Sequence, residues 1–418
     1  MKKIKIIGAS TLAALEGNLV MTLLPNVLRR AVRWGSSAVG IACLMITTAA
    51  GAGETWATFA SYTGVSGPVR AVTTFDDDLI VGGQFGTAFG PPPGSGTPVA
   101  GTLGIARWND VTGWAALGTG MNNTVMCLTT FGNDLIAGGQ FTSASGASNT
   151  TYIARWNGSS WSSLGTGMNG VVYALAVFNN ELYAGGAFTK AGGKTVNRIA
   201  KWNGSAWSSV ASGMNGNVGA LTTLNGALYA GGDFTKVGST TGFNRIAKWN
   251  GSAWSKLGTG VNGTSIVYAL TSFGTDLIVG GQFAMAGGVA GTTSIARWSG
   301  STWSPLGSGL NNTVMSLATF DDLSGSGPEL YVGGYFTAPV GGAANSAVQI
   351  ARWNDNDDQW WAVGKGMVVT QPDDSMQRAV FALSPDPSRA LLWTGGFCVV
   401  SPPTVGEAGF LMGYYFVP

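Results

Sequence analysis

Histidine is absent from the sequence, which has 418 residues. Histidine is the commonest general base and the commonest side-chain ligand of transition metals, so its absence excludes Ser-His and Cys-His nucleophile pairs and argues against a transition-metal centre. Cysteine is rare, with three residues. Cys43 lies in the N-terminal segment described below. Cys127 and Cys398 fall in different repeats, and we expect them to be buried as small hydrophobic residues without forming a disulfide.

Charged residues are also scarce. They make up 10% of the sequence, and 22 lysines and arginines nearly balance 20 aspartates and glutamates. A nucleic-acid-binding protein usually carries a strong basic surface, so nucleic acid is not an expected partner. Glycine, by contrast, is abundant at 66 residues, and 45% of the residues are hydrophobic. This composition excludes a disordered chain and indicates strands joined by tight turns.

The N-terminal segment has the pattern of an export signal. A cluster of three arginines precedes the apolar run 37–50, and an Ala-Gly-Ala motif that ends at Ala52 fits a cleavage site. We predict that residues 1–52 are a signal peptide, with Met21 as an alternative start. The apolar run is short for a membrane span, so no stable insertion is expected after cleavage. We expect residues 53–418 to form one domain that is secreted, extracellular or at the cell surface, with the periplasm as the alternative.

Three signatures recur along residues 53–418. The first, Gly-Gly-x-Phe, ends at Phe85, Phe141, Phe188, Phe234, Phe283 and Phe336, with a worn copy at 395–397. The second, Ile-Ala-Arg/Lys-Trp, ends at Trp108, Trp156, Trp202, Trp249, Trp298 and Trp353. The third is a tryptophan after a short turn, at Trp114, Trp161, Trp207, Trp254, Trp303 and Trp360. Self-similarity at a fixed period is typical of repeat architectures.

Each repeat predicts four short strands, which in the third copy lie at 173–178, 182–186, 199–202 and 207–210. Such a sheet cannot bury both its faces and must stack on its neighbours. The last copy of the third signature is missing at the C-terminus, but Trp56 supplies it at the front. We therefore predict an all-β fold: a seven-bladed β-propeller with four-stranded antiparallel blades, in which the N-terminal strand completes the last blade and closes the ring.

The local chemistry agrees with this fold. Asn-Gly between the third and fourth strands, as at Asn157-Gly158, predicts a turn with positive φ at both residues. The paired glycines of the second strand are expected to admit a neighbouring backbone or an indole ring. We expect both tryptophans of each repeat to be buried in the core. The cations beside the third-strand tryptophans are predicted to pack between blades, with their charge near a tryptophan face or a strand-edge carbonyl; they are Arg155, Lys201, Lys248, Arg297 and Arg352.

The repeats resemble the kelch repeat, the blade type of the galactose-oxidase central domain. The shared features are the Gly-Gly at the end of the second strand, the aromatic residue on the third, and the tryptophan after a short turn. The Gly-Gly-x-Phe and Ile-Ala-Arg/Lys-Trp-Asn-Gly patterns look closer still to repeats of secreted bacterial propellers and of fungal cortical-marker surface proteins. The resemblance covers residues 53–418 and implies a fold. It implies no single function, because such propellers include enzymes, adaptors and adhesins.

The activities of the enzymes with similar repeats are not expected for this sequence, because the residues that those activities need are absent. Galactose oxidase holds copper through two histidines, which are absent here. Sialidase-type propellers carry Ser-x-Asp-x-Gly-x-Thr-Trp boxes and an arginine cluster, and the sequence has no such box. A calcium loop at Asp355, Asp357 and Asp358 lacks the required glycine and terminal glutamate. We therefore predict no catalytic residue, no cofactor and no metal site.

Irregular loops mark a first candidate ligand surface. The expected topology brings the loops of blades six, seven and one into one sector of one face, where binding sites on rigid scaffolds are often built. The polar residues of these loops are Gln371, Asp373, Asp374 and Glu407, and blade one adds the proline-rich segment 91–93. The alternative, which we favour, is that the blades that close a ring are simply degenerate.

Asparagines at the predicted channel mouth form a second candidate surface. They recur in Gly-Met-Asn-Gly-like turns at Asn169, Asn215, Asn262 and Asn311, with Ser66 in the matching place. Their side chains could converge on the axis. We favour the alternative that asparagine occupies these positions because the turn requires a positive φ.

These observations favour a non-catalytic, monomeric propeller that recognises an extracellular protein or carbohydrate, or that serves as a scaffold. One alternative is a sugar-active hydrolase that uses Asp373, Asp374 or Glu407 as its acidic residues. A purely structural surface protein is the other alternative.

Overall fold

The computed structural model divides into two units, Met1–Gly51 and Ala52–Pro418, and all of the residues it describes lie in the second. They are 55–58, 64–90, 97–109, 111–262, 265–321, 327–340, 349–355, 358–363, 379–386, 391–398 and 408–415. The predicted signal segment 1–52 lies outside them. Within the described residues the secondary structure consists of strands, and no helix is long and apolar enough to cross a membrane.

Six four-stranded antiparallel sheets follow one another along the chain. Sheet 1 is β3 (Val69–Phe75), β4 (Asp78–Gly83), β7 (Ile105–Asn109) and β8 (Gly113–Ala115). Sheet 2 is β9 (Val125–Phe131), β10 (Asp134–Gly139), β11 (Ile153–Trp156) and β12 (Trp161–Ser162). Sheet 3 is β13 (Val172–Phe178), β14 (Glu181–Gly186), β17 (Ile199–Trp202) and β18 (Trp207–Ser209).

The next three sheets repeat this order. Sheet 4 is β19 (Val218–Leu224), β20 (Ala227–Gly232), β23 (Ile246–Trp249) and β24 (Trp254–Ser255). Sheet 5 is β25 (Ile266–Phe273), β26 (Asp276–Gln282), β27 (Ile295–Trp298) and β28 (Trp303–Ser304). Sheet 6 is β29 (Val314–Phe320), β30 (Glu329–Gly334), β31 (Ile350–Asn354) and β32 (Gln359–Ala362). Short hairpins extend two loops, β15 (Lys190–Ala191) with β16 (Lys194–Thr195) and β21 (Lys236–Val237) with β22 (Thr240–Thr241).

A C-terminal sheet joins the two ends of the described chain. It contains β33 (Ala379–Asp386), β34 (Leu391–Cys398) and β35 (Ala408–Tyr415), and β1 (Thr55–Thr58) pairs antiparallel with β35 so that Trp56 lies opposite Tyr414. The same sheet continues through β2 (Gly64–Val65) to the hairpin of β5 (Ala88–Gly90) and β6 (Thr97–Val99). The long loop of sheet 1 therefore adds strands to the last sheet.

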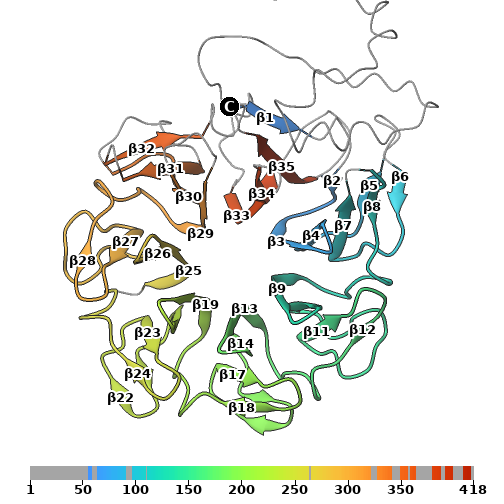
Figure 1. Ribbon diagram of the computed structural model, residues 1–418, viewed down its shortest axis with the longest axis horizontal. Helices are drawn as coiled ribbons and strands as arrows, with labels where there is room; N and C mark the ends of the chain where they lie inside the picture. Colours follow the sequence, from blue (N-terminus) through green and yellow to red (C-terminus); the bar gives the residue numbers. More distant parts are fainter. Residues whose placement is uncertain are drawn as a thin grey trace, which may run out of the picture. The chain divides into compact units, whose positions relative to one another are not determined.

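The sheets bury their faces against one another, as the repeat pattern predicted. One core cluster combines Phe178, Tyr183 and Ile199 of sheet 3 with Val218 and other side chains of sheet 4. The first strands of successive sheets contact each other from β3 through β9, β13, β19, β25 and β29 to β33, and β33 in turn contacts β3. In Figure 1 these first strands lie innermost and the fourth strands lie outermost.

The tight turns of the sheets follow the sequence prediction only in part. Between β13 and β14, Asn179 and Asn180 have φ of 49° and 57°, which makes a tight hairpin. Between β11 and β12 the predicted turn forms at Asn157-Gly158, but the expectation of a positive φ at both residues was wrong. Gly158 has φ of 93°, whereas Asn157 has no positive φ and instead uses Oδ1 to accept hydrogen bonds from the backbone N–H groups of Ser159 and Ser160. Asparagine stabilises this turn through its side chain.

The paired glycines of the second strand make room for the backbone and for the next sheet. A Cβ on Gly185 would lie 2.5 Å from Cγ1 of Val218 in sheet 4, and one on Gly186 would lie 2.0 Å from the carbonyl oxygen of Val171. The expected close approach of backbone is thus confirmed. The neighbouring side chain at Gly185 is a valine methyl and not an indole ring.

Most tryptophans of the two signatures are buried, as predicted, whereas Trp108, Trp254 and Trp360 are half-buried. The tryptophans also connect neighbouring sheets. In sheet 3, Trp202 and Trp207 have ring centroids 5.4 Å apart and are buried. Nε1 of Trp207 donates a 2.9 Å hydrogen bond to the carbonyl oxygen of Leu164, which lies in the linker that follows sheet 2. The same bond joins Trp161 to Leu117, Trp254 to Val210, Trp303 to Leu257 and Trp360 to Leu306.

The cations of the third strand find a different partner from the predicted one. Lys201 Nζ lies 2.8 Å from Oε2 of Glu181, at the start of the second strand of the same sheet. The other pairs of this kind are Arg107–Asp78, Arg155–Asp134, Arg297–Asp276 and Arg352–Glu329. The acid lies diagonally across from the cation on the adjacent strand and on the same face of the sheet. Residues in this position come within reach of long side chains. Lys248 has alanine at the acidic position and lies over the ring of Tyr229 instead, 5.8 Å from its centroid.

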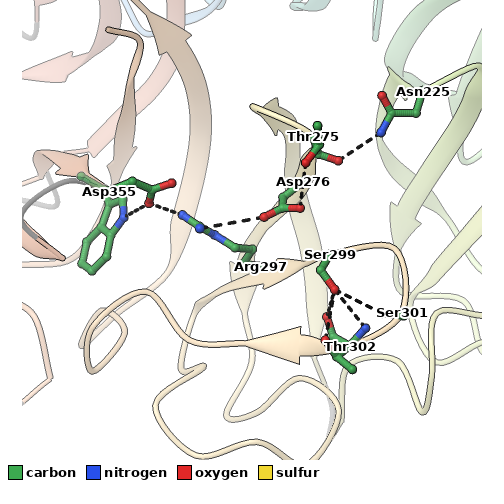
Figure 2. A network of polar contacts seen from close by, with 9 residues as sticks. Asn225, Thr275, Asp276, Arg297, Ser299, Ser301, Thr302 and Asp355 are labelled. Carbon is green, nitrogen blue, oxygen red and sulfur yellow. Dashed lines mark hydrogen bonds and ion pairs between the residues drawn. The ribbon is translucent and has the colours of Figure 1, made fainter. Parts of the chain in front are cut away.

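One of these cations also reaches the neighbouring sheet. Arg297 of sheet 5 forms ion pairs with Asp276 of its own sheet and with Asp355 of sheet 6, and Figure 2 shows the guanidinium between the two carboxylates. Oδ1 of Asp355 also accepts a 2.7 Å hydrogen bond from Nε1 of Trp353. The carboxylate of Asp355 is therefore engaged in an ion pair between sheets.

Replacing Lys201 with methionine should lower the free energy of unfolding by about 0.5–1 kcal/mol at neutral pH, because it leaves Glu181 without its partner in a partly buried site. The hydrogen bond to Glu181 raises the pKa of Lys201. A raised lysine pKa stabilises the fold below the unfolded pKa of about 10.4 and ceases to do so as pH rises through the folded value.

The measurement is urea unfolding of both proteins between pH 7 and pH 11. The difference in unfolding free energy between wild type and Lys201→Met should become smaller in the alkaline range. Lys248→Met is the matched control, because Lys248 has no acidic partner among the described residues, and its effect on the unfolding free energy should not change with pH in the same way. If the difference in unfolding free energy between wild type and Lys201→Met stays constant to pH 11, the ion pair does not stabilise the fold.

Candidate functional site

Every first strand contains a β-bulge at the same place. In β13, Val172 pairs with Gly186 and Ala174 with Gly185, so that Tyr173 has no partner in the register. A bulge of this kind re-aims the extra side chain. The residues at the equivalent positions of the other described first strands are Arg70, Met126, Gly219, Tyr268, Met315 and, in β33, Phe381.

The bulged residues of sheets 1 to 6 surround a cavity where the first strands of these sheets meet. Its volume is about 390 Å³, within the usual range for small-ligand sites. It is lined by Arg70, Met126, Tyr173, Asn217, Gly219, Gly232, Asp233, Ile266, Tyr268 and Met315. The bulged positions of sheets 1 to 6 are all in this set. Gly219 contributes no side chain, which widens the cavity on the side of sheet 4.

A small polar group lies on one side of the cavity. The carboxylate of Asp233 accepts hydrogen bonds from the backbone N–H and from Nδ2 of Asn217. Burial raises the pKa of Tyr268, and the nearby Tyr335 and Asp233 raise it further. Burial also lowers the pKa of Arg70, although a guanidinium remains protonated in proteins. The cavity thus holds tyrosine rings, one cation and one anion in a partly desolvated setting.

Asp233 and Tyr335 share a position in the repeat. Both occupy the variable place of the Gly-Gly-x-Phe signature, where the other copies have Gln84, Gln140, Ala187 and Gln282. The second strand ends here, beside the start of the first strand. Of the residues after Gly-Gly, Asp233 lines the cavity together with the bulged residues of sheets 1 to 6.

The asparagines proposed for the channel mouth form clamps between loops. Oδ1 of Asn169 accepts hydrogen bonds from the N–H groups of Thr189 and Lys190, and its Nδ2 donates to Oγ1 of Thr189. Asn122, Asn215 and Asn311 repeat this arrangement, Asn262 accepts from Met285, and Oγ of Ser66 accepts from Gly86 and Thr87. None of these asparagines has a positive φ, so the favoured turn explanation was wrong. They are not among the cavity-lining residues, and a ligand contact through them stays a prediction.

Other sequence predictions fall partly or wholly outside the described residues. Gln371, Asp373, Asp374 and Glu407 lie outside, as do Pro91-Pro92-Pro93 and Asp357. In the part of the chain that the structure describes, no group of three or more acidic or cysteine side chains is placed to hold a metal ion. Cys127 is a free thiol, as predicted, but its residue is half-buried and not fully buried. Desolvation of the thiol raises its pKa well above the usual value.

One of the comparisons with known proteins bears on the fold of the chain. Residues 110–305, from β8 to β28, match the family model of the Rax2 C-terminal β-propeller domain. The chain thus contains a β-propeller domain. A propeller domain of this kind fits a non-catalytic module, whereas the kelch-like type stays a prediction. No curated protein matches the chain. Among solved structures, the computationally designed Ika8 protein is 15% identical, with 86% of this chain and 99% of that chain covered and a TM-score of 0.48.

Sequence reasoning missed the cavity residues, although the sequence contains a signal for them. The first strand reads Val-x-Ala/Ser/Cys-Leu/Val in each copy. The position x varies far more than its neighbours and holds Arg70, Met126, Tyr173, Gly219, Tyr268 and Met315. A position that varies from copy to copy, while its neighbours keep the same character, indicates a residue that the fold itself does not constrain. The bulge directs this residue to the cavity, but it cannot be detected from the alternating pattern of hydrophobic and polar residues in the strand.

Proposed function

We propose that this protein is a secreted, non-catalytic, kelch-like propeller that recognises extracellular carbohydrate in its central cavity. The observation that carries the proposal is the cavity itself, where Tyr173 and Tyr268 line a space of about 390 Å³ together with the polar groups of Arg70, Asn217 and Asp233. Flat aromatic rings pack well against the apolar faces of sugars, and a few convergent polar groups orient the hydroxyls.

The proposed ring has seven blades and is closed by the N-terminal strand. The pairing of β1 with β35 supports closure, because the start of the propeller domain then supplies the outer strand of the last sheet. Contacts of β3 with β33 and β34 support it from the inner side. A closed ring suits a recognition module, since it holds the cavity-lining strands rigidly in place.

The chemistry of the cavity favours binding over hydrolysis. Glycoside hydrolases generally use a pair of carboxyl groups that flank the scissile bond. Among the described residues that line the cavity, Asp233 is the one carboxylate, and Asn217 donates hydrogen bonds to both of its oxygens. The alternative enzyme would depend on Asp373, Asp374 or Glu407, which lie outside the described residues.

Replacing either Tyr173 or Tyr268 with alanine should weaken the binding of a cognate oligosaccharide by about tenfold, because each change removes an aromatic contact of about 0.5–1.5 kcal/mol together with its buried area. The full chain is produced in a secreting host and its mature N-terminus is sequenced, with Gly53 expected. Ligands are first found on a broad glycan array, and their dissociation constants are then measured by calorimetry.

Trp361→Ala is the matched aromatic control, because Trp361 is 44% exposed on β32, the outermost strand of sheet 6. Its binding should equal that of the wild type. Failure of every arrayed glycan to bind the correctly folded protein would remove the proposed function. Release of reducing sugar from a bound oligosaccharide would replace it with the enzyme alternative.

A further inference from the structure

Sheet 4 departs from the other sheets at three positions that line the cavity. The bulged position of its first strand is Gly219, where sheets 1, 2, 3, 5 and 6 have a large side chain. The residue before the first valine of this strand is Asn217, and the residue after the paired glycines is Asp233. At these two positions sheets 1, 2, 3, 5 and 6 have neither asparagine nor aspartate. All three residues line the cavity.

The register of β19 and β20 brings these departures together. Val218 pairs with Gly232, so Asn217, Gly219 and Asp233 adjoin one pair of opposite residues. Oδ1 of Asp233 accepts a hydrogen bond from the backbone N–H of Asn217, and Oδ2 accepts a 3.0 Å hydrogen bond from Nδ2 of the same residue. The missing side chain at Gly219 widens the cavity beside this fixed carboxylate. Sheet 4 therefore contributes an open, negatively charged side.

The carboxylate of Asp233 keeps room for a ligand. An ionised carboxylate offers about four acceptor sites, and the hydrogen bonds from Asn217 occupy two of them. Among the described residues Asp233 forms no ion pair, although it is half-buried. The acids of the described ion pairs are Asp78, Asp134, Glu181, Asp276, Glu329 and Asp355. A partly desolvated charge is stabilised when a partner of opposite sign is brought to it.

Tyr268 provides the second part of this side of the cavity. It is the bulged residue of β25, and β25 contacts β19 of sheet 4. Burial raises its pKa, and the nearby Tyr335 and Asp233 raise it further, so the phenol lies close to the Asp233 charge. A cation bound to a carboxylate here can also lie over an aromatic face. Arg70 is not this cation, because it belongs to sheet 1, whose first strand contacts β9 and β33, and it has an interaction of its own.

We infer that the cavity selects an amino sugar, whose protonated amine binds Asp233 while its ring packs on Tyr268. This inference rests on the proposed carbohydrate-binding function and adds the class of sugar. An ammonium group donates three hydrogen bonds, which suits a carboxylate with acceptor sites left, and this compact group fits the space beside Gly219. A lysine-rich peptide would use the same carboxylate, but its flexible side chains would gain less from the rings of Tyr173 and Tyr268.

The test measures the affinity of the full chain for four probes in mildly acidic buffer, where sugar amines are protonated. The probes are a glucosamine oligomer, its fully N-acetylated counterpart, a glucose oligomer of the same linkage and length, and polylysine. The wild type should bind the glucosamine oligomer at least about tenfold more tightly than either neutral sugar, as expected for one hydrogen bond between charged groups.

Two variants of Asp233 test its charge. Asp233→Asn keeps the shape of the side chain and should lower affinity for the glucosamine oligomer about 10- to 100-fold, with no change for the neutral sugars. Asp233→Glu restores the charge at a shifted position, so its affinity should lie between those of wild type and Asp233→Asn. Asp134→Asn is the matched control and should bind as wild type does, because Asp134 pairs with Arg155 and does not line the cavity.

A further variant tests the space beside the carboxylate. Gly219→Met introduces the residue that sheets 2 and 6 have at their bulged positions, so the fold is expected to accept it. The longer side chain should fill the widened part of the cavity and weaken binding of the glucosamine oligomer. Wild-type affinity in Gly219→Met would contradict the placement of the amine at sheet 4.

The outcomes distinguish this inference from the proposed function. Equal wild-type affinity for the glucosamine oligomer and its N-acetylated counterpart would overturn the amino-sugar inference and leave carbohydrate binding intact. Binding of none of the sugars would contradict both. A preference for polylysine over the glucosamine oligomer would overturn the assignment of a sugar amine. Thermal unfolding shows which variants keep the fold, and the comparison of probes on the wild type depends on no variant.

Discussion

Replacing Trp207 with alanine is expected to lower the free energy of unfolding by about 3–5 kcal/mol, the range observed when large aromatic residues are removed from a core. Trp207 is 1% exposed and packs against Trp202, with ring centroids 5.4 Å apart. The alanine variant loses the apolar contacts of the indole and leaves a cavity that the surrounding sheet can fill only in part.

The indole also holds sheet 3 to the linker after sheet 2. The variant leaves the carbonyl oxygen of Leu164 without the donor that Trp207 supplies through Nε1 at 2.9 Å. Trp207→Phe separates the two effects, because phenylalanine keeps most of the apolar volume and loses the donor. We expect Trp207→Phe to cost about 1–3 kcal/mol, the usual penalty for an unsatisfied buried acceptor combined with imperfect packing.

Equilibrium unfolding in guanidinium chloride, followed by tryptophan fluorescence and circular dichroism, measures both variants. Trp361→Ala is the control, since Trp361 is 44% exposed and should change stability by less than about 0.5 kcal/mol. Equal small effects for Trp207→Ala and Trp361→Ala would contradict the role of this tryptophan in joining the sheets.

Replacing Gly186 with alanine is expected to destabilise the protein by about 3 kcal/mol, the upper part of the range for overpacked cores. The new Cβ would lie 2.0 Å from the carbonyl oxygen of Val171 and 3.0 Å from Cδ1 of Phe188. The first of these atoms belongs to the backbone beside the bulge of β13, so the conflict cannot be relieved by rotation of a side chain. The bulge and the residue that it directs to the cavity should shift with it.

Gly86→Ala is the matched control for this prediction, because the nearest atom to its Cβ is Oγ of Ser66 at 3.6 Å, an ordinary contact. Its stability should stay within about 0.5 kcal/mol of the wild type. Urea midpoints of the two variants provide the comparison. If Gly186→Ala is as stable as Gly86→Ala, the close approach at the paired glycines does not constrain the sheet.

The strands were predictable because their signals are local. In the third repeat, the predicted strand 199–202 matches β17, and the other three differ from β13, β14 and β18 by one residue at one end. Alternating hydrophobic residues and turn residues determine these bounds within each copy. Burial of most tryptophans was predictable too, since large aromatic rings that recur in every copy contribute most to stability when they are buried in the core.

The partners of polar side chains were less predictable. Lys201 was expected near an indole or a carbonyl, but Glu181 lies 20 residues earlier in sequence and becomes its neighbour only through the register of two strands. Asn169 was expected to occupy its position because its own turn requires a positive φ. Its side chain instead forms a hydrogen bond with Thr189, in a loop 20 residues later. Periodicity shows that such residues recur, but the atom that each one meets depends on how two loops come together.

The sequence by itself determined a β fold of stacked repeats, the bounds of its strands and the buried tryptophans, because these depend on short-range patterns that every copy repeats. The tertiary structure alone decided where the variable residues go. A bulge in each first strand places Arg70, Tyr173 and Tyr268 around one cavity, although they belong to three different sheets. Side chains that are far apart in sequence form a site only when the sheets surround a common centre, and no single repeat contains that information.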